Sequence, residues 1–180
     1  MTSIDIPIVD TLDDGIAYAT PAQYWITNQT VAGTMYNVGL RFLGITLGLV
    51  ITAAYIRYYV TGTTGSPGCN MRCTFEKSAS PVQITTYADY FGRSLTTAYV
   101  DFVVETDTGW HNSPSLVSII QELVNAYGYN SGIMQAFLRP ISGDYDVNLN
   151  DYGTDPTKAT ILHIEYTLGS RRGAANFLMF

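Results

Sequence analysis

Apolar residues recur every three or four positions between Ser113 and Gly128, in the segment SPSLVSIIQELVNAYG. This spacing places one apolar face along a helix, formed by Leu116, Val117, Ile119, Ile120, Leu123, Val124 and Tyr127. Ser113 can cap the first turn, Pro114 suits the first helical position, and Gly128 can adopt the left-handed conformation that ends a helix. The pattern therefore predicts one amphipathic helix at about residues 114–127.

Elsewhere apolar and polar residues alternate, or form short apolar runs bounded by Gly, Pro, Asn and Asp, as is typical of β-strands. Strands are predicted at Tyr36–Phe42, Val50–Val60, Asn70–Phe75, Ala98–Val104, Ile133–Leu138, Asp146–Leu149 and Thr160–Thr167. Parallel α/β folds need alternating helices, which this pattern lacks. We therefore expect an all-β fold, an antiparallel β-sandwich of the jelly-roll type with a single helix. The domain should cover residues 1–168, including an N-terminal arm, and an apolar tail should follow at residues 169–180.

The longest stretch without a charged residue, Phe42–Ile56, contains 15 residues and is interrupted by Gly44 and Gly48. It is too short for a membrane-spanning helix, so two strands around a glycine turn are expected. The first segment, MTSIDIPIVDTLDDG, carries acidic residues where a signal peptide carries basic residues and an apolar core. These patterns favour synthesis in a host cytoplasm and no membrane association.

The two cysteines lie in the segment GCNMRCTFEK, where Cys69, Met71, Cys73 and Phe75 alternate with polar residues. This alternation predicts a strand with one apolar face. Four strand positions separate the two sulfurs by roughly 13 Å, which is too far for a disulfide. No second cysteine pair or nearby histidine completes a zinc site. Both thiols are therefore expected to be buried and free.

Charged residues make up only 13% of the 180 residues, about half the usual share, whereas 14 residues are Tyr. A neutral polar surface of this kind suits contact with other proteins, including further copies of the chain, although a hydrated sheet face rich in Thr and Tyr has the same composition. The net charge of -6 and the scattered Lys and Arg residues argue against nucleic acid and anionic membranes as partners.

Four segments follow one another in a recognisable order: GLRF at Gly39–Phe42, ITAAYIRYYV at Ile51–Val60, Trp110 followed by SPSLVSIIQELVNAYGYNSG, and KATILHIEYT. Together they resemble a jelly-roll domain related to carbohydrate-binding modules, a family found in bacterial surface proteins and phage virion proteins. The chain matches the pattern of that family at Pro114, Gln121, Glu122, Val124, Gly128, Ser131, Gly132 and Leu162–Tyr166. It departs from the pattern at Ser115 and Tyr129. The resemblance covers most of residues 12–167 and implies the fold more directly than any activity.

Catalytic chemistry is not indicated. A glycosidase needs two carboxylates that face each other across the scissile bond, and the sequence does not pair Glu122 with another acidic residue. Glu122 is expected on the polar edge of the helix, where it ties loops together. His163 should alternate outward with Ile161 and Glu165 in the last strand. No GxSxG, phosphate-binding or HExxH motif occurs, so we expect no enzymatic activity.

Oxygen-bearing side chains alternate along Asp144, Asp146, Asn148, Asn150 and Asp151, an arrangement that resembles a calcium-binding loop. However, Leu149 stands where such a loop needs a glycine for its bend. Tyr145, Val147 and Leu149 also form the alternate face of an ordinary strand. A calcium ion at Asp144, Asp146 and Asn148 and a turn that leads into an edge strand are therefore alternatives, and no other cofactor is expected.

The final segment carries two arginines, Arg171 and Arg172, and then four apolar residues, Phe177, Leu178, Met179 and Phe180. It is either a last strand or a tail that docks on a neighbouring subunit. Together with the low charge and the single compact domain, the docking tail favours a structural component of a tailed-phage virion. A capsid decoration or surface protein that binds other virion proteins and forms a homo-oligomer is the function we expect.

The alternative is a carbohydrate-binding or adhesion module that contacts host glycans. It is supported by the family resemblance and by aromatic residues that we expect to be exposed and able to stack on sugar rings. These residues are Trp25, Tyr58, Tyr59, Tyr129 and Tyr145.

Overall fold

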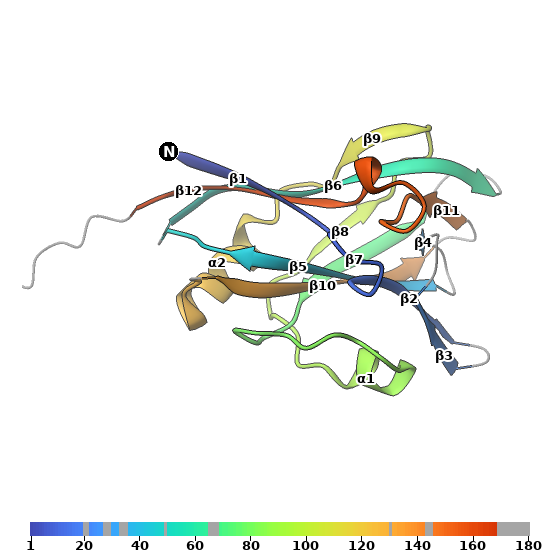
Figure 1. Ribbon diagram of the computed structural model, residues 1–180, viewed down its shortest axis with the longest axis horizontal. Coiled ribbons are helices and arrows are strands. Elements are labelled where there is room, and N and C mark those ends of the chain that lie inside the picture. The colour runs from blue at the N-terminus through green and yellow to red at the C-terminus, as the bar shows by residue number, and fades with distance from the viewer. Residues whose placement is uncertain are drawn as a thin grey trace, which may run out of the picture.

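The computed structural model describes residues 1–19, 22–26, 30–32, 36–48, 50–64, 69–129, 131–142 and 146–168. Within these ranges the strands form two antiparallel sheets that pack face to face as a β-sandwich (Figure 1). The predicted fold class is therefore confirmed.

Each sheet contains six strands. Sheet A contains, in spatial order, β1 (Thr2–Pro7), β12 (Ile161–Thr167), β6 (Val50–Thr64), β11 (Asp146–Leu149) and β4 (Thr30–Ala32), and β9 (Gly109–Asn112) also pairs with β6. Sheet B contains β3 (Ala22–Trp25), β2 (Asp14–Ala19), β5 (Tyr36–Ile45), β10 (Gly132–Ser142), β7 (Asn70–Phe75) and β8 (Val100–Val103).

The longest strand, β6, pairs with β12 along its first half and with β9 and β11 along its second half. Successive side chains on a strand point to opposite faces of the sheet. In β6 the buried residues are Ile51, Ala54, Ile56, Tyr58 and Val60. The intervening residues, among them Tyr55, Arg57 and Tyr59, are half-buried or exposed on the outer face of sheet A.

Two apolar clusters hold the sandwich together. The main cluster lies between the sheets and includes Phe42 from β5, Ile56 from β6 and Leu162 from β12. The second cluster contains Ala17, Ile84, Tyr90 and Phe137 and lies on the other side of sheet B. Tyr90 belongs to α1 (Tyr87–Gly92), a short helix that the sequence analysis did not predict. The segment around α1 thus covers the outer face of sheet B (Figure 1).

The predicted amphipathic helix exists as α2 (Val117–Tyr127), and its apolar side contributes Ile119, Ile120, Leu123 and Val124 to the main core. Gly128 ends the helix with a φ of 59°, as predicted, and its N–H donates to Val124 O. The predicted start at Ser113 and Pro114 is wrong, because the helix begins at Val117 and has no side-chain cap.

Ser113 instead forms hydrogen bonds with the backbone of β6. Its Oγ accepts the N–H of Ile56 at 3.0 Å, and its own N–H donates to Ile56 O at 2.8 Å. The N–H of Leu116 donates to Ala54 O, and Gln121 Oε1 accepts the N–H of Ile51 at 2.9 Å. The segment before α2 therefore satisfies backbone groups that a neighbouring strand would otherwise pair.

Most predicted strands are present with similar bounds, and the stretch Phe42–Ile56 does form two strands, β5 and β6. The segment expected as an N-terminal arm contains β1, which pairs with β12 along its whole length. The expectation of a single helix is wrong because α1 and a short 3-10 turn, η1 (Pro156–Lys158), are also present. Among the described residues, no helix is long and apolar enough to cross a membrane.

Both cysteines are buried and free, as predicted. Burial raises the pKa of the Cys69 thiol to about 11, and it also raises the pKa of Cys73. The neutral thiol is therefore the stable form of both side chains at physiological pH.

Replacing Cys73 with Ser should lower the free energy of unfolding by about 1–3 kcal/mol, because a hydroxyl would replace a sulfur on a fully buried apolar strand face. Urea denaturation followed by circular dichroism measures this change. The matched control is Cys73→Ala, which removes the sulfur without adding a polar group. Equal stability of the Ser and Ala variants would show that the buried hydroxyl has no cost here.

Candidate binding face on sheet A

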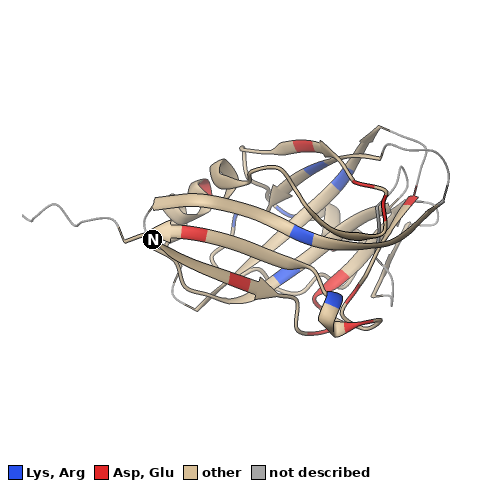
Figure 2. Cartoon of the chain, turned by 90° about the horizontal axis from the view of Figure 1, so that it is seen from above, with Lys and Arg blue, Asp and Glu red and all other residues tan. Residues whose placement is uncertain are grey.

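The outer face of sheet A is the side of the sandwich that α1 and α2 do not cover (Figure 1). Figure 2 looks onto this side and shows only a few charged residues spread along its strands. Side chains from five elements lie on this face. We call them the sheet A face: Asp5 from β1, Tyr55, Arg57 and Tyr59 from β6, Trp110 from β9, Lys158 from η1, and His163 and Glu165 from β12.

One row of the sheet A face crosses β1, β12 and β6 at a single register position. Asp5 lies opposite His163, and His163 lies opposite Tyr55. The imidazole Nδ1 of His163 is 2.6 Å from Asp5 Oδ1, and its Nε2 is 3.6 Å from Glu165 Oε1. The same imidazole stacks on the Tyr55 ring, with 4.5 Å between the ring centroids. The contacts on both sides fix the orientation of His163.

A second row lies further along β6, where Tyr59 pairs with Trp110 in β9. The two rings meet edge to face, with 5.5 Å between their centroids. The guanidinium of Arg57 lies 4.6 Å from the centre of the Trp110 ring, and Lys158 Nζ lies 4.9 Å from the centre of the Tyr59 ring. Each cation is attracted by the negative face of its aromatic ring.

Lys158 is itself held in place by Asp155, whose Oδ2 is 2.9 Å from Nζ. Hydrogen bonds from Thr157 and Lys158 lower the pKa of Asp155 to about 2, and the neighbouring Asp155 carboxylate raises the pKa of Lys158. Both side chains therefore stay charged across the physiological range. The sheet A face combines aromatic rings held in fixed orientations with hydrogen-bond donors and acceptors, so it can bind a ligand without reorganising.

The structure changes the list of candidate sugar-stacking aromatics. Tyr59 lies on the sheet A face as described. Tyr58 and Tyr129 are buried at 3% and 5% exposure, so the expectation that they are exposed is wrong. Tyr58 is on the inward side of β6, and the Tyr129 ring packs against Gly132. Tyr145 lies outside the described residues.

Trp25 is exposed, but it lies on β3, an edge strand of sheet B, and therefore not on the sheet A face. Its ring stacks on Tyr18, and Tyr18 stacks in turn on Tyr36, with about 5 Å between neighbouring centroids. Its ring N–H donates to Gln23 Oε1. Trp25 is therefore part of a separate cross-strand ladder.

The sequence analysis missed Tyr55, Arg57, Trp110 and Lys158 as site residues. The alternation of Tyr55, Arg57 and Tyr59 along the predicted strand was the available signal. It indicates a shared face, but it does not show whether that face is covered by another part of the chain. His163 and Glu165 do point outward, as the sequence analysis predicted.

The acidic residues considered for catalysis have structural partners. Glu122 accepts the N–H groups of Thr97 and Ala98 at 3.0 and 2.8 Å, and its Oε1 is 3.1 Å from Lys77 Nζ. Burial opposes ionisation of Glu122, but these hydrogen bonds outweigh it and lower its pKa. Glu122 therefore ties α2 to the loop before β8, which is the role expected of it from the sequence.

The calcium candidates are only partly visible, because Asp144 lies outside the described residues. Asp146 and Asn148 are on β11, a plain strand that places Val147 and Leu149 in the core. Burial raises the pKa of Asp146. Within the described ranges no group of three or more His, Cys, Asp or Glu side chains is arranged to hold a metal ion.

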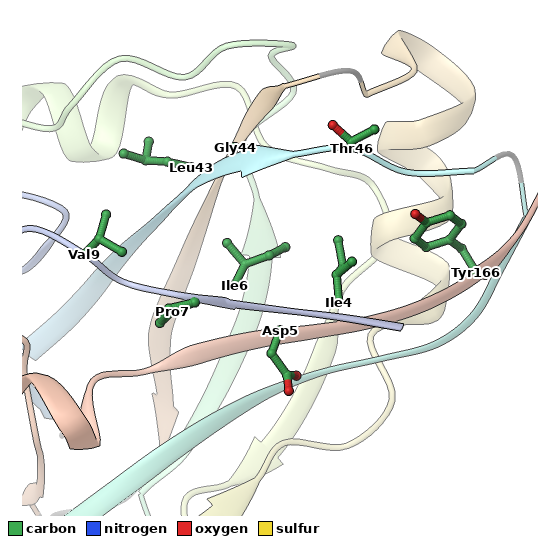
Figure 3. A pocket seen from close by; sticks show the side chains of 9 residues that line it. All are labelled: Ile4, Asp5, Ile6, Pro7, Val9, Leu43, Gly44, Thr46 and Tyr166. Atoms are coloured by element: carbon green, nitrogen blue, oxygen red, sulfur yellow. The ribbon is translucent and has the colours of Figure 1, made fainter. Parts of the chain in front are cut away.

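A cavity of about 400 Å³ lies between β1 and β5 and is separate from the second row of the sheet A face (Figure 3). Ile4, Ile6 and Tyr166 point into the space below β5, whereas the Asp5 side chain points away from it (Figure 3). Sugar sites combine apolar walls with several converging polar groups, and this cavity is mainly apolar. The predicted docking residues Arg171, Arg172 and Phe177–Phe180 lie outside the described residues.

No family model and no curated protein match the chain. Among solved structures it is similar to the native structure of a family 35 carbohydrate-binding module from Clostridium thermocellum, with a TM-score of 0.37 and 12% identity over 93% of this chain and 100% of that chain. It is also similar to TmCBM61 in complex with β-1,4-galactotriose, with a TM-score of 0.33 and 13% identity over 91% of this chain and 88% of that chain. These similarities are too weak to assign a function.

Replacing Glu122 with Gln should lower the free energy of unfolding by about 1–2 kcal/mol at pH 7, because an amide cannot accept all the hydrogen bonds that the carboxylate accepts. The lowered pKa means that the carboxylate stabilises the native state above the pKa of the unfolded chain. That contribution is lost as the pH falls through the lower folded value. Urea denaturation of both proteins at pH 7 and pH 3 should therefore show a smaller difference at pH 3. An equal difference at both values would contradict a role for the charge.

Proposed function

We propose that this chain is a non-catalytic binding module that takes an extended carbohydrate on the sheet A face. The observation that carries the proposal is the pair Tyr59 and Trp110, two aromatic rings fixed by cations on the sheet face that α1 and α2 do not cover. The proposal does not require any part of the chain outside the described residues.

Aromatic rings bind sugars through the apolar C–H side of the pyranose, while the ring edge stays in water. Tyr59 and Trp110 are both half-buried, so each presents part of its surface to solvent. Arg57 lies over the Trp110 ring and Lys158 lies over the Tyr59 ring, so each cation holds its ring in place through one face. Binding therefore costs little side-chain entropy, because the rings are already ordered.

Hydroxyl groups of a sugar need fixed donors and acceptors. Arg57 supplies guanidinium donors beside Trp110, and Asp5, His163 and Glu165 supply acceptors and an imidazole along the neighbouring row. Charge-assisted hydrogen bonds of this kind are stronger than bonds between neutral groups. The two rows together can therefore orient a ligand as well as attract it.

The shape of the site favours a chain of sugars over a single enclosed one. A sheet surface is flat, and the cavity between β1 and β5 lies apart from the aromatic pair. A flat face gains contact area by extending along the ligand. We therefore infer that the ligand is an oligosaccharide or polysaccharide that spans both rows.

The absence of catalysis is part of this proposal. Glu122 is engaged by two backbone N–H groups and Lys77, and Asp101 accepts hydrogen bonds from Nε and Nη2 of Arg72, both at 2.8 Å. Neither of these two carboxylates is on the sheet A face, and the two acidic residues of that face, Asp5 and Glu165, both lie beside the His163 imidazole. A glycosidase would need two carboxylates that flank the bound glycan.

Replacing Trp110 or Tyr59 with Ala should weaken glycan binding about tenfold or more, because each change removes a ring that the ligand covers. The chain contains only two tryptophans, so Trp25→Phe leaves Trp110 as the sole reporter of binding by fluorescence. We would screen the Trp25→Phe protein on a glycan array and titrate the best ligand while following Trp110 emission. The affinities of the Tyr59→Ala, Trp110→Ala and Trp25→Ala proteins for that ligand would be measured by isothermal titration calorimetry.

Trp25→Ala is the matched control, since it removes an exposed tryptophan from sheet B. It should leave the affinity unchanged. Two results would count against the proposal. One is an array on which no glycan binds, and the other is a glycan whose affinity is the same for the Trp110→Ala and Trp25→Ala proteins.

Docking to a virion is the second candidate. The observation in favour of docking is that edge strand β8 exposes Val103 at 57%, and Tyr99, which directly precedes β8 in the chain, is exposed at 52%. An edge strand with exposed apolar side chains is a common site of pairing with another chain. A virion component that also binds host glycans would combine the two candidates.

Deleting residues 170–180 should leave the melting temperature nearly unchanged, because β12 ends at Thr167 and completes its pairing with β6 before the deletion begins. If the segment is an anchor, the truncated protein should lose oligomerisation or cosedimentation with phage particles. Differential scanning calorimetry and analytical ultracentrifugation measure these two properties. A sharp fall in the melting temperature would instead identify the segment as part of the domain.

A further inference from the structure

The cavity between β1 and β5 lies where both sheets have an open edge. β1 is the edge strand of sheet A, and within the described residues it pairs only with β12. In sheet B, β2 pairs with β5 as far as Leu40, and the last bond between these segments runs from the Arg41 N–H to Asp13 O. Beyond Arg41, no described strand continues along that side of β5. The sandwich is therefore open along this corner.

The backbone of β1 has free hydrogen-bonding groups on its open side. In an antiparallel pair, the N–H and C=O groups of successive residues face alternate sides of the strand. The Ile8 N–H donates to Thr160 O, so Ile6, two positions earlier, also directs its backbone groups toward β12. Ser3 and Asp5 therefore direct theirs away from β12. An extended segment can pair with these groups and add a strand to the sheet.

The walls of the cavity are apolar. The side chains of Ile4, Ile6 and Tyr166 point into the space below β5, and Leu43 lines the cavity from β5 (Figure 3). Asp5 is the charged residue among the lining residues, and its side chain points away from the cavity (Figure 3). Apolar walls beside free backbone groups suit an extended apolar peptide.

The chain itself carries such a segment, and that segment begins beside the cavity. Tyr166 lines the cavity, and the described part of the chain ends at Leu168. Residues 169–180 follow and end in the apolar run Phe177–Phe180. Twelve extended residues reach up to roughly 40 Å, which is enough to arrive at a neighbouring molecule. Leu168 is 81% exposed, so the last described residue is not packed against the groove of its own chain.

We propose that the groove between β1 and β5 binds the C-terminal segment of a second copy of this chain as an added strand along β1. Alternate residues of a strand point to one side, so two of the four side chains of Phe177–Phe180 enter the groove. The low share of charged residues, 13%, favours contact between copies.

Each copy donates one segment and receives one. The assembly therefore closes as a reciprocal dimer or a ring, or it extends as a chain of copies. The inference does not depend on the proposed glycan site, because the groove and the second row of the sheet A face are separate surfaces.

Sedimentation velocity of the full chain, up to about 100 μM, tests the contact. The wild-type protein should form oligomers. Val9 is 49% exposed and lines the groove, so Val9→Asp should fold and should raise the dissociation constant of the oligomer about tenfold or more. Phe180→Asp should have the same effect from the other side of the contact.

Val82→Asp is the matched control, because Val82 is exposed at 66% and does not line the groove. It should sediment like the wild-type protein. A wild-type chain that stays monomeric would overturn the proposal, and so would an oligomer that Val9→Asp and Val82→Asp affect equally.

Cross-linking locates the segment and identifies its donor. Leu43→Cys would be combined in the full chain with Leu178→Cys or with Met179→Cys, since one of two adjacent strand residues faces the groove. Cys69 and Cys73 are buried, so they should not interfere. After mild oxidation, one of the two proteins should form a disulfide between chains, which doubles the mass on a non-reducing gel.

Val82→Cys combined with the same partners is the control and should not cross-link. A disulfide within one chain would show that the segment occupies the groove of its own molecule, and it would overturn the assignment to a second copy. No disulfide from Leu43→Cys, or equal cross-linking from Val82→Cys, would overturn the assignment of the groove.

Discussion

The register of β6 is the constraint on which both faces of sheet A depend. Because side chains alternate along a strand, a shift of one residue would exchange Ile56 and Tyr58 for Arg57 and Tyr59 in the core. The pairing of Leu162 with Ile56 and of His163 with Tyr55 fixes this register from β12. The same hydrogen bonds that bury the apolar half of β6 therefore present its aromatic and cationic half to solvent.

The outer faces of the two sheets differ in what packs against them. On sheet B, the segment that contains α1 packs Ile84 and Tyr90 against Ala17 and Phe137. The Tyr90 hydroxyl also donates to Val38 O, so this cover is attached to the strands themselves. Sheet A has no comparable cover from α1 or α2 (Figure 1). An uncovered sheet face needs polar groups for solubility, and the pairing of rings with cations meets that need while keeping the rings accessible.

Much of the fold could be predicted because its central strands alternate clearly. Asn70–Phe75 and Asp146–Leu149 were predicted with the bounds that the structure shows, and β6 was predicted from its first residue. Short strands such as β3 and β9 were missed because pairing with distant segments, rather than local pattern, makes them strands. The start of α2 was misplaced for a similar reason. Ser113 has the side chain of a helix cap, but β6 uses that side chain for the N–H of Ile56.

The candidate site residues also divide into those that the local sequence pattern indicates and those that only long-range strand pairing brings together. Tyr59 could be identified as a candidate because an aromatic residue on a polar strand face stands out locally. Its partner Trp110 could not, because 51 positions in the sequence separate the two and only the pairing of β6 with β9 joins them. Such long-range pairs therefore have to come from the structure, and the sequence can supply only the residue types that make them chemically useful.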